Sequence, residues 1–231
     1  MQTSHDSKKF ALVIHGGAGV VSRDSIPDDD AKCMQADLDM ALDAGHAVLS
    51  AGGTALDAVS AAIVVLEDSP WFNAGKGSVF NAEGGHELDA SVMEGHTRRA
   101  GAVAGVSTVK NPILLARSVM EKSEHVMLAG EGAEKFADTQ LDIERVDPKY
   151  FDTDKRWKQL QDAKALEAEQ ALHTVQGTYF GTVGAVALDL HGNIAAGTPT
   201  GGMTNKKWSR VGDSPIIGAG TFATEYCGVS G

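Results

Sequence analysis

The sequence contains few cysteines, and fewer basic than acidic residues. Two cysteines in 231 residues, Cys33 and Cys227, can form at most one bridge, so a disulfide-stabilised scaffold is excluded. Lysine and arginine together number 20 against 31 aspartates and glutamates, and the formal net charge is −11. A surface with this excess of negative charge repels phosphate backbones, and no basic stripe interrupts it. We therefore expect no nucleic-acid partner.

Long apolar runs are also missing. The longest covers residues 58–66, whereas a helix needs about 20 apolar residues to span a bilayer. The first nine residues, MQTSHDSKK, carry no apolar segment of the kind found in secretory signals. We therefore expect no membrane partner and a cytoplasmic location, with a periplasmic mature form as the alternative.

Several catalytic signatures are absent from the sequence. The glycine-rich segment 15–19 contains neither a P-loop nor a dinucleotide fingerprint, which leaves nucleotide binding as a remote alternative. None of the eight histidines has the spacing of paired zinc ligands, and no G-x-S-x-G elbow occurs. Cys33 lies in a helical pattern and is expected in the core, while Cys227 has no histidine near it in sequence. These absences argue against a catalytic zinc and an α/β-hydrolase, and they leave a cysteine nucleophile open only through long-range contacts.

The composition is that of a globular protein with an excess of glycine. Hydrophobic residues make up 42% and charged residues 22% of the chain, and its length suffices for one sizeable domain. Its 27 glycines amount to about 12%, against a usual ~7%. Such an excess predicts many tight turns or a site lined by close backbone.

Periodicity predicts a mixed α/β domain with some antiparallel sheet. A Thr54–Asp57 capping box and an Asn111 cap followed by Pro112 mark two of the helix starts. Residues 147–178 are polar, which predicts a marginal helix and then a mobile linker. Helices are expected over 31–50, 54–67, from 112 onward and near 132–137, and strands over 10–14 (buried), 88–93, 100–109, 126–129, 182–190, 194–197 and 216–219, with a hairpin turn at 191–193.

The remaining candidate nucleophile is Thr182, where the polar linker meets an apolar strand. A threonine hydroxyl is a weak nucleophile unless a base lies beside it. Cleavage of the Gly181–Thr182 bond would supply that base, because a free α-amino group has a pKa of about 7.7–8.0. On spacing alone an ordinary strand-opening threonine is favoured, and the nearby pair Gly177-Thr178 shows how unspecific the motif is.

Longer motifs change this balance. Segments 181–189 (GTVGAVALD), 201–206 (GGMTNK) and 210–215 (RVGDSP) resemble the signature segments of the plant-type L-asparaginase/isoaspartyl peptidase family. This family belongs to the N-terminal-nucleophile hydrolases of the threonine type. The similarity runs from about residue 11 to the last residue, apart from the linker. Four further segments match the amino-terminal half of the family in order: 15–19, 72–75, 86–90 and 101–106.

The resemblance implies a four-layer αββα sandwich made as an inactive precursor. Self-cleavage between Gly181 and Thr182 would separate an α-subunit portion, 1–181 with a linker over about 147–181, from a β-subunit portion that starts with 182–231. Together the two portions form one domain, and the family implies a homodimer of αβ units. Family members continue into a Thr-Gly-x-Gly segment that forms the oxyanion hole; the printed chain stops before it, and the fold is expected to lack that C-terminal part.

The resemblance also implies roles for individual residues. Thr182 would attack the side-chain amide of L-asparagine or the β-peptide bond of an isoaspartyl dipeptide and release L-aspartate. Thr200 would orient its hydroxyl, and Asn73 would belong to the same polar network. Arg210 would hold the substrate α-carboxylate and Asp213 its α-ammonium.

A structural sodium ion is implied, and no cofactor is expected for catalysis. The loop 66–76 resembles the family's sodium loop, in which backbone carbonyls would coordinate the ion; a capped turn without metal is the alternative. The carbonyls are those of Leu66, Glu67, Ser69, Phe72, Ala74 and Lys76.

Two other functions stay open. Within the enzymes, a glycosylasparaginase-like amidase is the alternative to a β-aspartyl peptidase. Outside them, the chain could be a truncated or uncleaved member that acts as a binding partner without catalysis.

Overall fold

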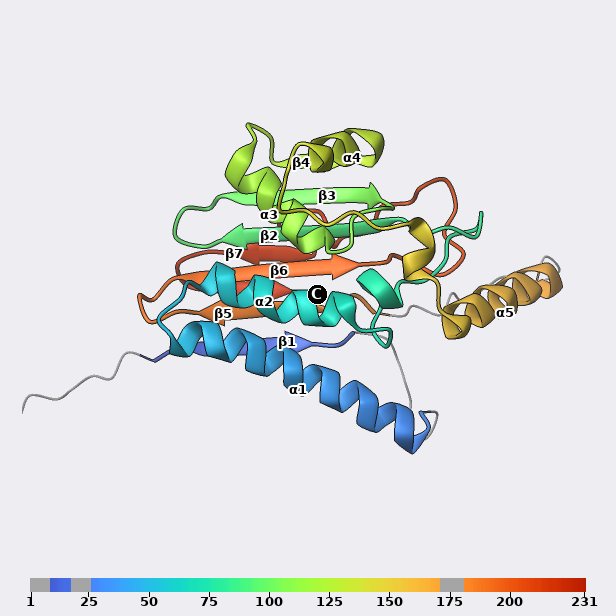
Figure 1. Ribbon diagram of the computed structural model, residues 1–231, viewed down its shortest axis with the longest axis horizontal. Helices are drawn as coiled ribbons and strands as arrows, with labels where there is room; N and C mark the ends of the chain where they lie inside the picture. The colour runs from blue at the N-terminus through green and yellow to red at the C-terminus, as the bar shows by residue number, and fades with distance from the viewer. Residues whose placement is uncertain (1–8, 18–25, 171–180) are drawn as a thin grey trace, which may run out of the picture.

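A computed structural model describes residues 9–17, 26–170 and 181–231 (Figure 1). The helices are α1 (Asp28–Ser50), α2 (Ala55–Asp68), α3 (Pro112–Lys122), α4 (Gly130–Asp138) and α5 (Asp154–Gln170), with short 3-10 helices at Gly75–Gly77 and Pro148–Phe151. The strands are β1 (Ala11–His15), β2 (Leu88–Glu94), β3 (Ala100–Val106), β4 (Met127–Ala129), β5 (Gly184–Leu188), β6 (Ile194–Thr200), β7 (Thr221–Ala223) and β8 (Gly228–Ser230). Within these ranges, no helix combines the length and the apolar character needed to cross a membrane.

Six strands form one sheet in the order β1-β5-β6-β2-β3-β4 (Figure 1). Its neighbours are antiparallel except for β3 and β4, which are parallel. β5 and β6 come from beyond residue 181 but lie between β1 and β2. The segments before and after the Gly181–Thr182 bond therefore share one hydrogen-bonded sheet.

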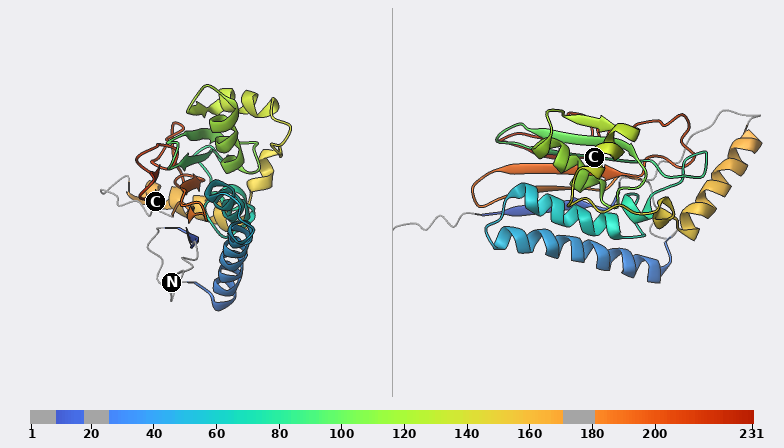
Figure 2. Two further views of the ribbon diagram at one scale, coloured as in Figure 1. Left: turned by 90° about the vertical axis from the view of Figure 1, so that its left-hand side faces the viewer. Right: turned by 45° about the horizontal axis from the view of Figure 1, so that its top comes forward.

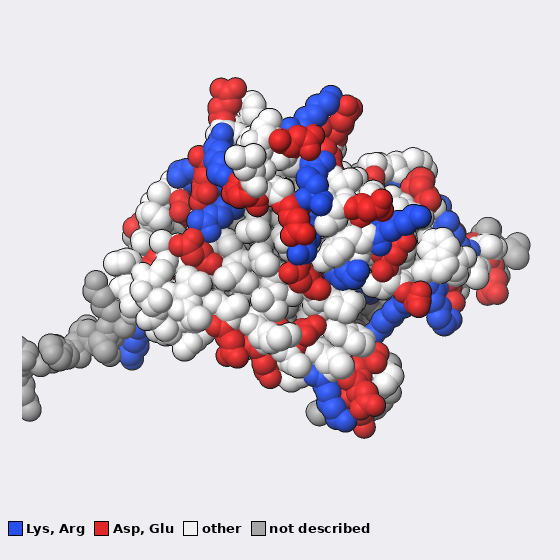
Figure 3. Space-filling model, in the orientation of Figure 1, with Lys and Arg blue, Asp and Glu red and all other residues white. Residues whose placement is uncertain are grey.

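Helices α1, α2 and α3 cover one face of this sheet, and the β7–β8 pair packs on the other (Figures 1 and 2). Acidic and basic side chains are interspersed on the helix-covered side (Figure 3). Helices, six-stranded sheet and two-stranded sheet are successive layers of the predicted αββα sandwich. The expected fold class is confirmed.

The helix-covered face of the sheet is apolar because strand residues alternate between its two faces. Leu88, Ala90 and Val92 of β2 point into the main hydrophobic core. A Cβ added at Gly197 of β6 would lie 2.8 Å from carbon atoms of Val59 and Ile63 on α2. The missing side chain at Gly197 therefore lets α2 pack directly against the sheet.

The helix starts follow partly from local sequence. Thr54 caps α2 as predicted, and its hydroxyl accepts a 3.1 Å hydrogen bond from the Asp57 amide. Asn111 is the N-cap residue of α3 and Pro112 follows it, as predicted, but the Asn111 side chain forms no capping hydrogen bond and donates to Asp68. The Ile113 amide of α3 donates to Glu67 Oε1 at 3.1 Å. Burial raises the pKa of the Glu67 carboxyl well above its ordinary value.

Three further expectations need correction. Cys33 is exposed on α1 and not in the core, because the helix turns other residues toward the sheet. β1 is an edge strand with β5 as its one neighbour, so Val13 is 67% exposed although the run reads as a buried strand. Residues 216–219 form turns and a single bridge, and the strand begins at Thr221.

The other predicted elements are confirmed within a few residues, including the β5–β6 hairpin around residues 191–193. The marginal helix predicted after residue 147 is α5. The mobile linker predicted to follow it falls on 171–180, outside the described residues.

Candidate active site

Three hydroxyl groups meet where β5 begins and β6 ends. Thr182 Oγ1 donates a hydrogen bond to Thr200 Oγ1 at 3.3 Å and lies 3.1 Å from Ser214 Oγ. Thr200 and Ser214 are buried, while Thr182 is partly exposed. The hydroxyl of Thr182 therefore has two fixed neighbours and an open side.

Strand register produces this meeting. Ala185 of β5 pairs with Gly197 of β6 in an antiparallel ladder, and continuing the register by three residues sets Thr182 opposite Thr200. Thr200 also pairs with Asp89 of β2. Thr200 thus ends an inner strand of the sheet, with β2 on one side and the start of the β5 segment on the other.

Ser214 is held by a second group of hydroxyls between the two sheets. Its carbonyl accepts a 2.6 Å hydrogen bond from Ser91 Oγ, which also lies 2.7 Å from Thr221 Oγ1. Thr221 donates to Thr198, and Thr198 lies 2.7 Å from Ser230 Oγ. We call Ser91, Thr198, Thr221 and Ser230 the hydroxyl network.

The hydroxyl network ends at His15, the last residue of β1. His15 Nε2 lies 3.2 Å from Ser230 Oγ, and burial lowers the pKa of the imidazole. Neutral imidazole can accept a hydrogen bond from the serine hydroxyl, so every hydroxyl of the network has a hydrogen-bond partner. A fully paired network of this kind can be buried without a large desolvation penalty.

Ser214 was missed by sequence reasoning. It lies in the segment 210–215 beside the predicted substrate residue Asp213, but a single serine in a loop carries no signal of its own. Only the fold of the β6–β7 connection brings its hydroxyl to Thr182.

Asn73 is fixed against the loop that follows Thr200. Its Nδ2 donates to Gly202 O at 2.7 Å, and its Oδ1 accepts from the Val79 amide at 3.1 Å. A Cβ added at Gly201 would lie 2.5 Å from Asn73 Oδ1. Asn73 is thus fixed against the residues that follow Thr200, and its membership of the catalytic polar network stays a prediction.

The glycine-rich turn after β1 packs on the bond preceding Thr182. A Cβ added at Gly17 would lie 3.4 Å from the carbonyl oxygen of Gly181. Gly17 has φ +137°, a conformation that other residues rarely adopt. This turn therefore brings backbone, without side chains, to the predicted cleavage bond.

Arg210 and Asp213 lie on the loop that carries Ser214. Both are exposed, and neither forms an ion pair within the described part of the chain. The Asp213 carbonyl accepts from the amides of Ile216 and Gly220 at 2.8 and 3.1 Å, which fixes the turn. The loop that brings Ser214 to Thr182 thus also carries one cation and one anion, neither of them in an ion pair among the described residues.

A buried ionic cluster supports this region from β2. Lys206 Nζ donates to the Glu87 carbonyl at 3.0 Å and lies 3.4 Å from Glu87 Oε2. Asp89 Oδ1 accepts from the Gly105 amide at 2.8 Å. Burial raises the pKa of Asp89, and the charge of Lys206 opposes that shift.

The loop 66–76 contains a tight cradle of backbone oxygens. A Cβ added at Gly75, which has φ +50°, would lie 2.2 Å from Glu67 O. A Cβ added at Gly77 would lie 2.1 Å from Phe72 O. No cluster of three or more histidine, cysteine or acidic side chains that could hold a metal occurs among the residues described. Carbonyl oxygens are the ligand type that hard cations prefer, and the implied sodium ion stays a prediction.

The arrangement defines the class of protein. A mixed α/β sandwich holds a threonine hydroxyl at the start of a central strand, beside two further hydroxyls and a free charge pair. That combination is typical of hydrolases with a threonine nucleophile.

Comparisons with known proteins agree. The family model described as asparaginase matches residues 8–231. The chain is 50% identical over 220 residues to the isoaspartyl peptidase of Escherichia coli, covering 93% of this chain and 68% of the relative. It is 45% identical to the plant-type L-asparaginase of Pyrococcus abyssi, covering 95% and 72%, and 44% identical to the isoaspartyl peptidase/L-asparaginase of Mus musculus, covering 95% and 65%. The chain belongs to the asparaginase family.

Proposed function

We propose that the protein is an autoprocessing threonine hydrolase that cleaves β-aspartyl amide bonds. Its substrates are L-asparagine and β-aspartyl dipeptides, and its product is L-aspartate. The single observation that carries the proposal is the position of Thr182 Oγ1 between Thr200 and Ser214, directly after Gly181. The names of the relatives support the same substrates.

Self-cleavage is the first proposed step. The Thr182 hydroxyl attacks the Gly181 carbonyl carbon, the C–N bond breaks, and an ester forms between the two residues. Water then hydrolyses the ester and leaves Thr182 with a free α-amino group. The portions 1–181 and 182–231 stay together, because β5 and β6 remain hydrogen-bonded to β1 and β2.

Turnover uses the amino group that cleavage has released. The α-amine accepts the proton of the Thr182 hydroxyl, whose oxygen attacks the β-carbonyl of the substrate. The C–N bond breaks, ammonia or an amino acid leaves with a proton, and an aspartyl ester remains on Thr182. Water hydrolyses this ester to L-aspartate and restores the hydroxyl.

Substrate recognition requires charges of both signs. The α-carbon of an aspartyl substrate carries a carboxylate and an ammonium group. We assign the carboxylate to Arg210 and the ammonium to Asp213, because both charges are free and their loop contacts Thr182 through Ser214. The hydrogen bonds that Thr182 Oγ1 forms with Thr200 and Ser214 restrict the direction from which it attacks.

The sodium ion is part of the same proposal. The carbonyl oxygens of Leu66, Glu67, Ser69, Phe72, Ala74 and Lys76 would hold it. A bound cation would offset the partial negative charge of these oxygens and would order the loop that carries Phe72 and Asn73.

Aspartate release by the full-length protein tests the proposed function. We expect hydrolysis of L-asparagine and β-aspartyl-leucine by the parent, loss of both with Thr182→Ala, and partial retention with Thr182→Ser. N-acetylglucosaminyl-asparagine is the substrate expected for the glycosylasparaginase-like alternative. We expect the protein to hydrolyse it poorly. A parent protein that is folded but hydrolyses neither main substrate would contradict the proposal and favour a non-catalytic member.

A further inference from the structure

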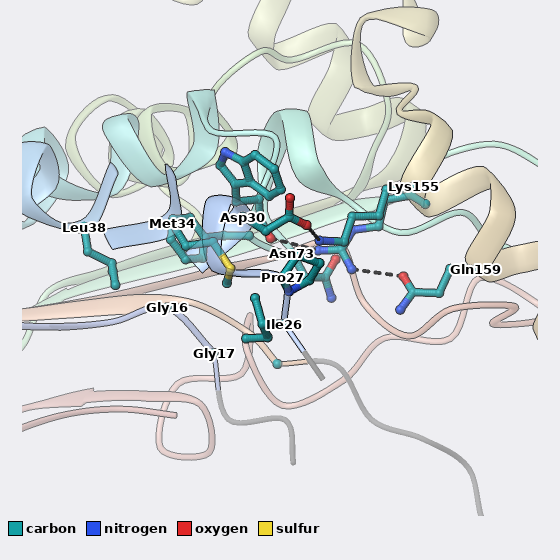
Figure 4. A pocket seen from close by; sticks show the side chains of 14 residues that line it. Gly16, Gly17, Ile26, Pro27, Asp30, Met34, Leu38, Asn73, Lys155 and Gln159 are labelled. Carbon is teal, nitrogen blue, oxygen red and sulfur yellow. Dashed lines mark hydrogen bonds and ion pairs between the residues drawn. The ribbon is translucent and has the colours of Figure 1, made fainter. Parts of the chain in front are cut away.

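A cavity of about 560 Å³ lies where the start of α5 meets the loop after α2 (Figure 4). Figure 4 labels Lys155 and Gln159 on α5 and Asn73 on the loop, and all three line the cavity. Arg156 of α5 is a further lining residue. Lys155 pairs with Asp30 at 3.3 Å, whereas Arg156 forms no ion pair among the described residues. The partners of Arg156 in this part of the chain are therefore neutral groups.

The guanidinium of Arg156 joins two parts of one loop. The residue is only 6% exposed. Its Nε donates to Gly77 O at 2.6 Å, and its Nη2 donates to Trp71 O at 3.4 Å. Its Nη1 donates to Gln159 Oε1 at 3.0 Å, within α5 itself. One planar group on α5 thus holds backbone carbonyls at both ends of the segment 71–77.

A buried arginine at this position is costly for the fold. Burial lowers the pKa of Arg156 to about 10, so the side chain is charged at neutral pH. In the uncleaved chain, burying a charge without a counter-charge costs free energy. Stability alone therefore does not explain the residue. The fixed fork of donors does, because a lysine offers a single nitrogen and could not hold the same set of acceptors in one plane.

The two carbonyls that the guanidinium holds lie on either side of Asn73 in the chain. Trp71 comes shortly before Asn73. Gly77 comes shortly before Val79, whose amide donates to Asn73 Oδ1 at 3.1 Å. A Cβ added at Gly77 would lie 2.1 Å from Phe72 O, so the two halves of the loop are in direct contact. Movement of either half would therefore displace the side chain of Asn73.

Asn73 connects this loop to the candidate nucleophile. Its Nδ2 donates to Gly202 O at 2.7 Å, and its carbonyl accepts from the Gly201 amide at 3.0 Å. The Gly202 amide donates to Thr200 Oγ1 at 3.1 Å. The same oxygen accepts from Thr182 Oγ1 at 3.3 Å. A continuous series of hydrogen bonds and one short loop thus leads from the guanidinium to the reacting hydroxyl.

We propose that Arg156 is a positioning residue for the Thr182–Thr200 pair. It fixes the loop 71–79, and the loop, through Asn73, fixes the peptide whose amide donates to Thr200. That amide sets the direction of the Thr200 hydroxyl and so the position of the nucleophile. The inference rests on the proposed function and deepens it, because self-cleavage and turnover both use the Thr182 hydroxyl.

Removal of the guanidinium, and its return from solution, test the proposal in the full-length protein. Arg156→Ala empties a position that borders the cavity, and free guanidinium ion presents the same planar donors. Arg156→Lys keeps the charge without the fork. Lys158→Ala is the matched control, because Lys158 is an exposed cation on the same helix that pairs with Asp162.

We expect Arg156→Ala to lower kcat for L-asparagine at least about tenfold, because a displacement of ~1 Å near the reacting groups can cost about 100-fold. KM should change less than about twofold, since the substrate charges are assigned to Arg210 and Asp213 on a different loop. Arg156→Lys should be intermediate. Lys158→Ala should stay within about twofold of the parent.

Chemical rescue separates positioning from a general loss of folded protein. Guanidinium at millimolar concentration should raise kcat of Arg156→Ala several-fold and leave the parent unchanged. Urea and tetramethylammonium chloride at the same concentration should raise neither. If Arg156→Ala stays uncleaved, the same additions are made to the uncleaved chain, and guanidinium alone should start the release of the two fragments.

Three results would overturn the positioning role while leaving the proposed function intact. They are a kcat of Arg156→Ala within about twofold of Lys158→Ala, a loss confined to KM, and a loss that guanidinium does not relieve. A folded parent protein that hydrolyses neither L-asparagine nor a β-aspartyl dipeptide would overturn both.

Discussion

The two faces of the six-stranded sheet differ in chemistry although the same strands form both. On β2, Ala90 and Val92 point to the helices, whereas Ser91 between them points to β7–β8. On β6, Gly197 contacts α2, while Thr198 and Thr200 point the other way. The alternation of a strand thus places apolar packing and reactive hydroxyls one residue apart.

The comparison shows how a buried site can be polar without destabilising the fold. The helix-covered face contributes the large hydrophobic core. The opposite face buries hydroxyls, but these bond to one another and to backbone carbonyls. We therefore expect the helix-covered face to determine stability and the hydroxyl face to determine the geometry at Thr182.

Ile63→Ala on the helix-covered face should have the largest effect on stability. Ile63 is fully buried on α2 against Gly197, and truncation of such a residue lowers the free energy of unfolding by about 2–5 kcal/mol. Urea unfolding in the uncleaved Thr182→Ala background measures this for one intact chain. The control Ile63→Val should lose about 0.5–1.5 kcal/mol. A clearly lower rate of self-cleavage in folded Ile63→Ala would contradict the assignment of stability to the helix-covered face and of site geometry to the hydroxyl face.

Thr198→Val tests the hydroxyl network with an almost unchanged shape. The hydroxyl of Thr198 donates to Gly220 O at 3.0 Å and bonds to Thr221 and Ser230. Its loss leaves buried polar groups without partners, and the free energy of unfolding should fall by about 1–3 kcal/mol. Thr198→Ser keeps the hydroxyl and should recover most of this. If both variants behave alike in urea, the methyl group and not the hydroxyl is what matters.

Ser214→Ala should affect rate more than stability. It removes the 3.1 Å contact with Thr182 Oγ1, and one such hydrogen bond corresponds to about 3–10-fold in rate. Self-cleavage and turnover should both slow by this amount, followed on denaturing gels and by aspartate release. Ser209→Ala, an exposed serine of the same loop that bonds to Glu87, is the control. Unchanged rates for Ser214→Ala would remove Ser214 from the site.

The smallest expected effect is a pH dependence from His15. Burial holds the pKa of the folded-state imidazole below its ordinary value, so the unfolded chain takes up the proton first as the solution is acidified. Stability should therefore fall as pH decreases below about 6.5. His15→Gln should show a shallower loss between pH 7.5 and 5.5 in urea titrations, whereas His125→Gln, at an exposed position, should match the parent. A parallel loss in all three would exclude His15 as the source.

Much of the fold could be predicted from local patterns. The 54–67 helix, the 88–93 strand and the hairpin at 191–193 follow from periodicity and turn residues. Errors arose where tertiary contacts decide. Asn111 is the N-cap residue of α3 as predicted, but the side chain that accepts a hydrogen bond from the first turn is Glu67 of a neighbouring helix. Cys33 fits the helical period of α1 yet lies on its exposed side.

The candidate site was predictable only in part. The pairing of Thr182 with Thr200 was expected from the family motifs, and the strand register explains it. Ser214 was not, because its contact depends on the path of a loop. The cavity could not be predicted either: it needs α5, which reads as a marginal polar helix, packed near the start of α1.

The central claim is that the Thr182 hydroxyl breaks the bond preceding it and then acts from a new chain terminus. N-terminal sequencing of an active preparation, with masses of both fragments, tests this most directly. The account predicts a second terminus that begins Thr-Val-Gly-Ala, fragments that elute together under native conditions, and an intact Thr182→Ala chain. Activity without that terminus, or cleavage at the same bond in Thr182→Ala, would contradict it.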